Sequence, residues 1–551
     1  MYTKEDRLYV NTSAVDINTI TCFYSYIQLV DTDTYTFSPE VMVSSSPAVL
    51  SSQHSSVWAR CVRNGLYWLD RLPVPKLVLH WLGVEIYHNI LLYVPRLDRP
   101  VQARTTDQYS VVTFIIDAVS QQNLVRSLPL TKSYLDSKGG FLFSGQNKVL
   151  HNSYPNVMAL LSGETGGGWP PDWPNRTGLY YLDTERQPLL QSLYSQHGYL
   201  TLQLEDLQVY GTLTRKHQLG FRKPPADIYY RAPFLAMLQE NFGWMRNRLV
   251  GKAECFACLQ EQLVHVPELR VVEDFISMYS AVPTFAHVHL NEYTHNDLNM
   301  GKLYDADLSQ MMKRLVSGLA LQNTFFLLMG DHGFQRAEDP FVLTRQGAVE
   351  NDLPALYLLP PADFSVRHPE KYQNLRNNAA KLTSFFDVNQ MLRQVLALAS
   401  NKTVEDIFRG FEGHGTSLFD DVGDRTCAQA DIPEDYCRCT DGIAELPARE
   451  ATEIARSIIR DINTFLAGFR LCQELELSEL KEATVKRGQL TSVKTKFSVR
   501  NRGGIFEGTF SWSPSQPSQL RSGKVVRLDW YSSTSTCVPD SLNYIRPYCI
   551  C

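Results

Sequence analysis

The sequence predicts an α/β fold built around a mainly parallel β-sheet. Five short apolar runs, each bounded by polar residues, have the composition of buried parallel strands. They cover residues 111–116, 199–204, 286–290, 324–329 and 354–359. Helical patterns separate these runs, and strands that alternate with helices are typical of a parallel sheet covered by helices.

Two segments between or after these strands have the apolar spacing of amphipathic helices. In residues 304–321 one face is apolar and consists of Leu308, Met311, Met312, Leu315 and Leu319. Asp305 or Asp307 is the expected N-cap of this helix, because a carboxylate accepts hydrogen bonds from the free backbone N–H groups. Residues 384–399 contain the second pattern.

Changes in amino-acid composition and apolar pattern along the chain predict three regions. Residues 1–104 mix Ser-rich stretches with short apolar runs and predict an irregular, partly β segment packed on the core. Residues 105–423 contain the predicted α/β core. Residues 424–551 are rich in cysteine, and their helical pattern at 447–469 precedes β-like segments, so we expect a smaller α+β subdomain.

The composition argues against a nucleic-acid partner and against a transmembrane segment. The chain has 551 residues, is 44% hydrophobic and carries a net charge of −5, which is ordinary for a folded globular protein. Its 53 Lys+Arg are outnumbered by 58 Asp+Glu and form no basic run, so we expect no nucleic-acid partner. No window of 18 or more apolar residues occurs, so we expect no transmembrane segment.

The cysteines and the glycosylation triplets predict an extracellular protein or one of the secretory-pathway lumen. None of the eleven cysteines lies in residues 62–254 or 259–426, a clustering that suggests disulfides around a central domain. The triplets beginning at Asn11, Asn175 and Asn401 suit a glycoprotein of the same compartment. Since the start "MYTKEDRLYV" is polar and is no signal peptide, we expect a leader or membrane anchor to be missing from this chain.

The spacing of the cysteines argues against a zinc ribbon. Only Cys255 and Cys258 have the knuckle spacing, whereas a ribbon needs two such pairs. An odd total leaves at least one cysteine outside intramolecular disulfides, either free or paired with another chain.

Polar residues that follow the predicted strands are the candidate site. In an open α/β sheet, ligands gather at the carboxyl ends of the strands. Side chains at these ends, together with a serine that starts a helix-like segment, provide carboxylate, imidazole, amide and hydroxyl groups, which can ligate Zn or Mn. The candidates are Asp117, Ser153, Asn291, His295, Asp331 and His332.

Each candidate also has a purely structural interpretation. Asp117 can be the N-cap of the helix that follows its strand, and Ser153 can be a simple helix cap. The Asp331–His332 pair after an apolar run favours a functional interpretation, because burying two ionisable groups needs compensation. His287 and His289 alternate on one strand face, and we interpret both as core histidines.

Several segments resemble motifs of the alkaline phosphatase/sulfatase superfamily. "FLLMGDHGF" and "FIIDAVS" are similar to its last and first metal-binding strands, and "SFFDVNQML" to a sulfatase helix. "NSYPNVMALLSG" resembles the nucleophile segment of the nucleotide pyrophosphatase/phosphodiesterase branch and matches Ser153 to the nucleophile. "GHGTSLFDD" matches His414 to a late histidine that often completes a second metal site.

More narrowly, the chain resembles over about residues 5–551 the sulfatase-like animal family of domain of unknown function 229. Its landmarks are similar to "SLPLTKSYL", "HNDLNMGKLYDADL", "ENDLP", "HGTSLF" and "RTCAQADIPEDYCRCT", in this order.

The resemblance implies an alkaline-phosphatase-like three-layer αβα core with a divalent metal centre of one or two ions, Zn or Mn. The first site would consist of Asp117, Ser153, Asp331 and His332, and a second site or substrate contact of Asn291, His295 and His414. Ser153 would then be a metal-bound nucleophile at a helix N-terminus, where backbone N–H groups favour a bound anion. This chemistry fits a hydrolase or transferase of phosphoester groups, in preference to sulfate esters, on a small molecule, glycan or lipid head group.

Two residues depart from the family pattern. Asn291 stands where two-metal relatives have Asp four residues before the second His, so a one-metal site like that of the lipoteichoic-acid synthases is an equal alternative. Val157 stands where the formylglycine motif Ser-x-Pro-x-Arg requires Arg, so we predict that the chain is not a formylglycine sulfatase. The alternative to an enzyme is a catalytically inactive binding protein that keeps the fold.

Overall fold

The computed structural model describes most of the 551 residues. The residues outside the description are 12, 14–15, 45–46, 67–83, 99–102, 106, 165–177, 183–187, 208–210, 216–218, 240–257, 260–261, 337–338, 401, 412, 439–442, 487–490, 501–503, 513–524 and 530–533. Asn175, Asn401 and Cys255 therefore lie outside the described residues, whereas Asn11 is described and exposed.

A seven-stranded sheet forms the centre of the molecule, with the strand order β10-β20-β19-β9-β18-β13-β15. The strands are β9 (Ser110–Ile116), β10 (Phe141–Leu142), β13 (Leu200–Glu205), β15 (Ile228–Tyr229), β18 (Thr284–Leu290), β19 (Thr324–Met329) and β20 (Leu356–Leu359). The five strands from β19 to β15 are parallel to their neighbours. Their carboxyl ends therefore meet at one edge of the sheet.

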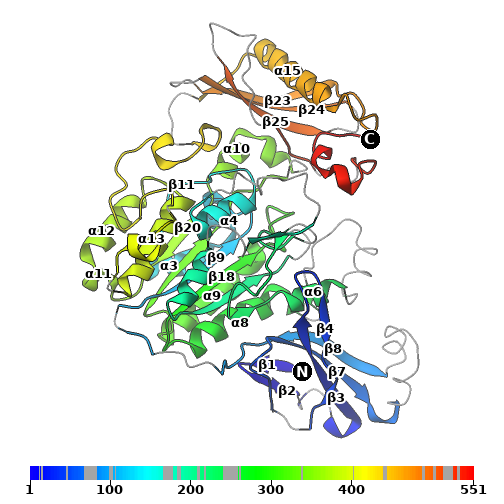
Figure 1. Cartoon of the computed structure of the whole chain (residues 1–551), viewed down its shortest axis with the longest axis vertical. Coiled ribbons are helices and arrows are strands. Elements are labelled where there is room, and N and C mark those ends of the chain that lie inside the picture. Colours follow the sequence, from blue (N-terminus) through cyan, green and yellow to red (C-terminus); the bar gives the residue numbers. More distant parts are fainter. Residues whose placement is uncertain are drawn as a thin grey trace.

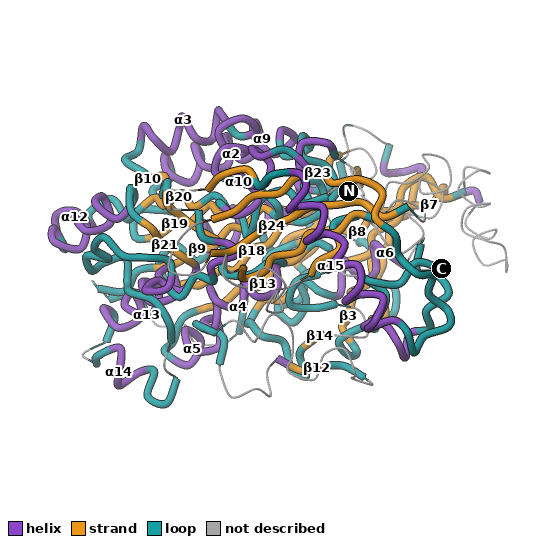
Figure 2. The backbone as a smooth tube through the Cα atoms, turned by 90° about the horizontal axis from the view of Figure 1, so that it is seen from above, coloured by secondary structure: helices purple, strands orange, loops and turns teal. Residues whose placement is uncertain are grey.

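Helices cover both faces of this sheet, so the core has three layers (Figures 1 and 2). One layer contains α2 (Gln121–Ser127), α3 (Pro129–Ser137), α8 (His265–Met278) and α9 (Lys302–Ser317). The other contains α4 (Ser153–Ser162), α5 (Leu190–Gln196) and α13 (Phe385–Leu398). Alternate residues of the strands enter two separate hydrophobic clusters, one for each helical layer.

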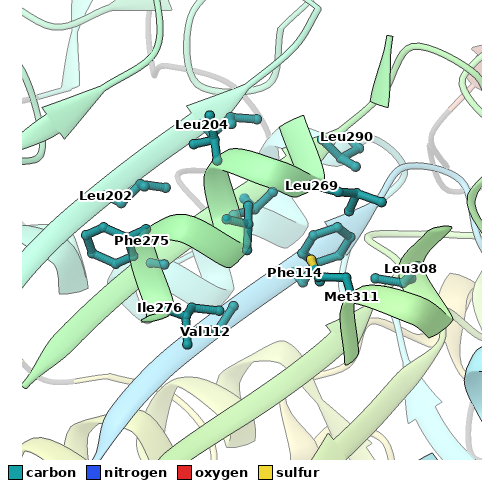
Figure 3. Close-up of a cluster of buried hydrophobic side chains, with 14 of the residues drawn as sticks. Val112, Phe114, Leu202, Leu204, Leu269, Phe275, Ile276, Leu290, Leu308 and Met311 are labelled. Carbon is teal, nitrogen blue, oxygen red and sulfur yellow. The ribbon is translucent and has the colours of Figure 1, made fainter. Parts of the chain in front are cut away.

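The cluster under α8 and α9 shows why these apolar patterns fold as they do (Figure 3). Phe114 of β9 lies in one buried cluster with Phe275 of α8 and Met311 of α9, and all three are fully buried. Burial of one such side chain contributes about 2 kcal/mol. The apolar face predicted for residues 304–321 is therefore confirmed as a packing face, except that Leu319 lies beyond the end of α9 and is exposed.

One predicted strand runs in the unexpected direction. β20 is antiparallel to β19, with Leu327 opposite Leu358. The chain that leaves β19 returns to the sheet at the same edge, where the Gly330 N–H donates to the Ala355 carbonyl at 2.9 Å. A strand that re-enters from the carboxyl edge must run backwards, so the sheet is mainly but not wholly parallel.

The N-cap expected for residues 304–321 was wrong. α9 begins at Lys302, with Gly301 as its N-cap, so Asp305 lies inside its first turn. Asp305 instead accepts hydrogen bonds from the backbone N–H groups of Leu130 (3.0 Å) and Thr131 (2.8 Å). It thus caps the neighbouring helix α3, which explains a buried carboxylate between two helices.

The N-terminal part consists of two small β-sheets. They are formed by β1 (Tyr2–Lys4), β2 (Arg7–Tyr9) and β6 (Ala48–Val49), and by β3 (Ile20–Leu29), β4 (Tyr35–Phe37), β5 (Val41–Met42), β7 (Ser56–Arg63) and β8 (Glu85–Leu92). Cys22 and Cys61 are register partners on β3 and β7 and form a disulfide. These sheets lie at one end of the core (Figure 1).

The C-terminal part is a small, disulfide-linked α+β unit, as the sequence predicts. Its antiparallel sheet contains β22 (Ile443–Glu445), β23 (Leu477–Lys486), β24 (Thr491–Val499), β25 (Ile505–Trp512) and β26 (Val525–Arg527). Helix α15 (Ala448–Leu466) packs on it through side chains spaced three and four residues apart, such as Ile454 and Ile458. Disulfides join Cys472 to Cys549 and Cys537 to Cys551, and a further disulfide, Cys427–Cys437, precedes this unit.

The other described elements are short and mostly connect these parts. They are η1 (Ile17–Thr19), β11 (Gly145–Asn147), β12 (Tyr180–Tyr181), β14 (Leu219–Gly220), α6 (Ala232–Gln239), β16 (Cys258–Leu259), β17 (Gln262–Leu263), η5 (Pro340–Leu343), α10 (Arg345–Asp352), α11 (Phe364–Arg367), α12 (Pro369–Asn378), β21 (Leu382–Ser384), α14 (Val404–Ile407), η6 (Ala428–Ala430), η7 (Glu434–Tyr436) and η9 (Asp540–Ile545). Among the described residues, no helix has the length and apolar composition that crossing a membrane requires. The predicted fold class, a three-layer α/β core with a smaller Cys-rich α+β subdomain, is confirmed.

Candidate active site

Two adjacent parallel strands bring the first two candidate residues together. Asp117 directly follows β9, and Asp331 follows β19 after one glycine. The two strands are neighbours, with Met329 opposite Ile115, so the residues that follow them leave the sheet side by side. The apolar strands thus carry the two carboxylates to the carboxyl edge of the sheet, where α/β folds bind ligands.

Asp117, Asp331 and His332 form a compact group of metal-ligand type. One ligand atom from each residue lies within 4.8 Å of the others, and all three side chains are buried. His332 Nε2 lies 3.7 Å from Asp117 Oδ1 and 3.5 Å from Asp331 Oδ2. These separations are those of atoms that can bind one ion together.

The carboxylates are poorly satisfied within the protein. Both oxygens of Asp117 and Oδ2 of Asp331 accept no hydrogen bond from the described part of the chain. Burial, reinforced by the negative charge of Asp331, raises the pKa of Asp117 well above its usual range. Since a buried unpaired charge is costly, this arrangement calls for a cation, and the orphaned oxygens fit one.

The ring of His332 is oriented for ligation through Nε2. Its Nδ1–H donates to the Gly333 carbonyl oxygen at 2.8 Å, which makes Nε2 the lone-pair nitrogen of the neutral ring. Ser153 Oγ (3.2 Å) and Gln335 Nε2 (3.4 Å) lie next to this nitrogen. Burial lowers the pKa of His332, which favours that neutral form. Gly333 is required by space, because a Cβ here would lie 2.1 Å from the Glu350 carbonyl oxygen.

Ser153 joins this group of side chains from the start of helix α4. It is the first residue of α4, and its Oγ lies 3.2 Å from His332 Nε2. The preceding residue, Asn152, is the N-cap but makes no side-chain capping bond. A hydroxyl at a helix N-terminus next to a ligand-type imidazole can serve either as a metal ligand or as a nucleophile.

Asn156 holds the start of α4 in place, and our sequence analysis did not identify it. Its Oδ1 accepts from the N–H groups of Val149 (2.9 Å) and Leu150 (3.1 Å), and its Nδ2 donates to the carbonyls of Leu150 and Asn152. Asn156 is fully buried. It therefore ties the loop that leads into Ser153 to the helix that begins there.

The side-chain amide of Asn291 is engaged with another acidic residue. Asn291 Nδ2 donates to Asp206 Oδ1 at 3.0 Å, and the Asn291 backbone N–H donates to the same carboxylate. Asp206 also accepts from the Glu292 N–H at 3.0 Å. Asp206 directly follows β13, just as Asp117 directly follows β9. The same sequence criterion, a polar residue directly after a predicted strand, would therefore have identified Asp206 as well.

His295 is paired with a guanidinium group. Arg336 Nη2 lies 2.9 Å from its Nδ1 and 3.0 Å from its Nε2, and Arg336 Nε donates to the His295 carbonyl oxygen. Burial and the positive charge of Arg336 lower the pKa of His295 to about 3. The charge of Arg336 also acts on Asp117 and His332, so this arginine adds positive charge to the surroundings of the site. No sequence motif pointed to Arg336.

His414 lies at the opposite end of α4 from Ser153. Its backbone N–H donates to the carbonyl of Gly163, the C-cap of α4. A helix of ten residues is about 15 Å long, so His414 and Ser153 are separated by roughly that distance. The His414 ring is half exposed and faces Glu164 at 3.9 Å and Asp431 at 3.4 Å.

The two histidines of β18 have different surroundings. His287 fits our interpretation as a core histidine, because its Nδ1 lies 2.9 Å from Thr113 Oγ1. His289 lies closer to the site, with Nε2 3.8 Å from Asp331 Oδ2. The sequence alone does not distinguish them, because both point to the same face of the strand.

Solved structures that resemble this chain include members of the alkaline phosphatase superfamily. A phosphonate monoester hydrolase of Agrobacterium radiobacter is 13% identical, with a TM-score of 0.36, and the match covers 79% of this chain and 94% of that one. An alkaline phosphatase superfamily protein of Vibrio parahaemolyticus is 12% identical, with a TM-score of 0.34 over 81% and 88%. A lipoteichoic acid synthase of Listeria monocytogenes is 9% identical, with a TM-score of 0.35 over 58% and 79%.

Sequence comparison is decisive at the level of the family. Comparison with curated proteins finds no match. The model of the family described as "Protein of unknown function (DUF229)" matches residues 9–481, which include every candidate site residue. The chain therefore belongs to this family.

Proposed function

We propose that this protein is a metal-dependent hydrolase or transferase that acts on phosphoester groups through Ser153. The observation that carries the proposal is the convergence of Asp117, Asp331, His332 and Ser153 at the carboxyl edge of the sheet, with buried carboxylate oxygens that have no described partner. Two carboxylates, one imidazole and one hydroxyl form a donor set that suits Zn or Mn. The proposed centre has one ion, since the amide of Asn291 donates to Asp206 and His414 lies at the far end of α4.

Each residue has a defined role in this proposal. Asp117, Asp331 and His332 would hold the ion, and Ser153 Oγ would complete its coordination. The bound ion would supply positive charge that lowers the pKa of the serine hydroxyl and polarises the phosphoryl group. His332 keeps its lone pair directed at the site through the hydrogen bond from Nδ1–H to Gly333.

The reaction would proceed by in-line attack of Ser153. Oγ, having lost its proton to solvent, forms a bond to phosphorus while the ester P–O bond on the opposite side breaks. The departing alcohol oxygen takes up a proton from water. Attack of a water molecule, or of an acceptor hydroxyl, on the phosphoserine then releases the product and restores Ser153. The positive end of the α4 dipole and the charge of Arg336 favour the anionic phosphoryl group.

Val157 supports phosphoester over sulfate-ester chemistry by the formylglycine route. It is fully buried in the hydrophobic cluster around α4, where the formylglycine motif would need an arginine. Four disulfides among the described residues support an extracellular or lumenal location, because such bonds persist in oxidising compartments. A small-molecule, glycan or lipid head-group ester is the proposed substrate class.

Metal analysis combined with a phosphodiester assay tests the proposal. The purified full chain is expected to contain about one Zn or Mn per molecule. It should hydrolyse bis(p-nitrophenyl) phosphate, and Ser153→Ala should lower kcat/KM by a factor of about 10³ or more. Ser153→Thr, which keeps a hydroxyl, should retain measurable activity. Ser133→Ala, which alters an exposed serine of α3, is the control and should behave like the wild type.

Two outcomes would count against this proposal. If no divalent metal is bound and Ser153→Ala behaves like the wild type, the catalytic proposal fails, and a binding protein that keeps the fold becomes the better explanation. Mass spectrometry that finds formylglycine at position 153 would instead replace phosphoester chemistry with sulfate-ester hydrolysis.

A further inference from the structure

His289 lies on the face of the sheet that α4 covers. It belongs to β18, where its register partners are Ile115 on β9 and Glu205 on β13. Ile115 belongs to the hydrophobic cluster that includes α4 residues, so His289 points toward the layer from which Ser153 approaches the site. Its side chain is almost fully buried, with 1% of its surface exposed.

The ring of His289 is unsatisfied within the described protein. Neither Nδ1 nor Nε2 has a hydrogen-bond partner among the described residues. A buried imidazole without partners costs free energy, so its presence needs a compensating interaction. His287, two residues earlier and equally buried, has such an interaction at one nitrogen, since its Nδ1 lies 2.9 Å from Thr113 Oγ1, while its Nε2 has no partner among the described residues.

A carboxylate oxygen of Asp331 lies close to the His289 ring. His289 Nε2 lies 3.8 Å from Asp331 Oδ2, which accepts no hydrogen bond from the described part of the protein. The other oxygen, Oδ1, already accepts from the N–H groups of Ala118 and His332, both at 2.9 Å. A shift of about 1 Å would bring Nε2 and Oδ2 within hydrogen-bond distance.

We infer that His289 is a positioning residue for the metal ligand Asp331: its Nε2–H donates to Oδ2 and holds that oxygen toward the ion. A carboxylate oxygen has two lone pairs, so Oδ2 can accept a hydrogen bond from His289 with one and bind the ion with the other. His289 lies outside the group of Asp117, Asp331 and His332, whose ligand atoms approach one another directly, so it acts through Asp331. This inference rests on the proposed metal site.

The test is the affinity of the full chain for Zn²⁺ alone, measured by competition with a chelator. Removing a residue that orients a metal ligand weakens metal binding 10- to 100-fold. His289→Leu, which cannot donate, is therefore expected to raise the Kd for Zn²⁺ by about 10- to 100-fold. His289→Gln, which keeps a donor, should restore part of this loss. His287→Leu is the matched control on the same strand and face, and its Kd should stay within about twofold of the wild type, since Thr113 is not a ligand.

The outcomes separate this inference from the proposed function. If wild type and His287→Leu bind Zn²⁺ alike and His289→Leu binds it more weakly, the positioning role is supported. If His289→Leu binds as tightly as the wild type, or if His287→Leu weakens binding equally, the inference is overturned and the metal site stands. If the wild type binds no Zn²⁺, both fail. Should His289→Leu not fold, the comparison of His289→Ala, which also lacks a donor, with His287→Ala decides, and equal Kd values for these two variants overturn the inference.

Discussion

Ser153 Oγ lies 3.2 Å from His332 Nε2, although the two residues are 179 positions apart in the chain. The contact joins the N-terminus of α4 to the end of β19. The carboxylates of Asp117 and Asp331 lie beside the same imidazole nitrogen. A helix N-terminus and two strand ends thus supply one group of side chains. The buried carboxylates of this group should destabilise the metal-free folded protein, and this effect can be measured without any substrate.

Asp117→Asn should stabilise the metal-free protein. The wild-type carboxylate is buried, has no described hydrogen-bond partner and is repelled by Asp331. Replacing it with a neutral amide of the same shape removes the repulsion, and we expect the free energy of unfolding to rise by about 1–3 kcal/mol. Urea unfolding with excess chelator measures this change. The same variant should lose Zn²⁺ binding, and an apo protein that becomes less stable would contradict this account.

Asp387→Asn should have the opposite effect on stability. Asp387 is buried at the start of α13, accepts from the N–H groups of Ser384 (2.7 Å) and Thr416 (2.8 Å), and forms an ion pair with Arg425. Removing the charge leaves Arg425 without its buried partner, and the expected loss is about 3 kcal/mol.

The same urea measurement on Asp406→Asn provides the control for Asp387. Asp406 occupies the equivalent position in the exposed capping box of α14 and pairs with Arg409 at 3.0 Å on the surface. Because solvent screens that pair, we expect a much smaller loss of stability than at Asp387. Equal losses of unfolding free energy at both positions would show that burial of the Asp387–Arg425 ion pair makes no extra contribution to stability.

His414→Ala should leave the metal content unchanged. His414 is separated from Ser153 by the length of α4, and its ring faces Glu164 and Asp431 rather than the strand ends. Elemental analysis of the variant should give the same ratio of metal to protein as the wild type. A ratio that falls from two to one would identify His414 as a ligand of a second ion and would refute the one-ion centre.

Glu205 should make stability depend on pH. Burial raises its pKa to about 7, opposed by the positive charge of Arg231 and by hydrogen bonds from Thr212 and Leu213, and reinforced by the charge of Asp206. The unfolded chain has an ordinary carboxyl pKa of about 4.3. Between these values the folded state binds more protons than the unfolded state, so stability falls as the pH rises and is lowest above about 7.

The difference between wild type and Glu205→Gln isolates this effect. Glutamine stays neutral, so the variant lacks the proton uptake, while the other titrating groups cancel. Relative to the variant, the wild type should lose about 3 kcal/mol between pH 4.5 and pH 7.5. Urea unfolding over this range is the measurement. A difference that does not change with pH would mean that Glu205 has an ordinary pKa in the folded protein.

Local pattern was sufficient to predict the elements of the core. All five apolar runs are strands, because a strand buried on both faces must be apolar throughout. The helix at residues 447–469 is α15, whose buried side chains repeat with helical spacing. The direction of β20 was not predictable in this way, since a strand has the same local pattern whether it runs parallel or antiparallel to its neighbour.

The sequence by itself determined the fold class, the family and the residue types that end the strands β9 and β19. Asp117 and Asp331 could be named because the carboxyl ends of parallel strands share one edge of the sheet. Only the tertiary structure decided that Asp305 caps α3, that Asn291 bonds to Asp206, and that His289 and His287 differ in their neighbours. The reason is physical: the order of residues specifies the backbone pattern locally, whereas the partner of a buried polar group depends on which distant segments pack against it.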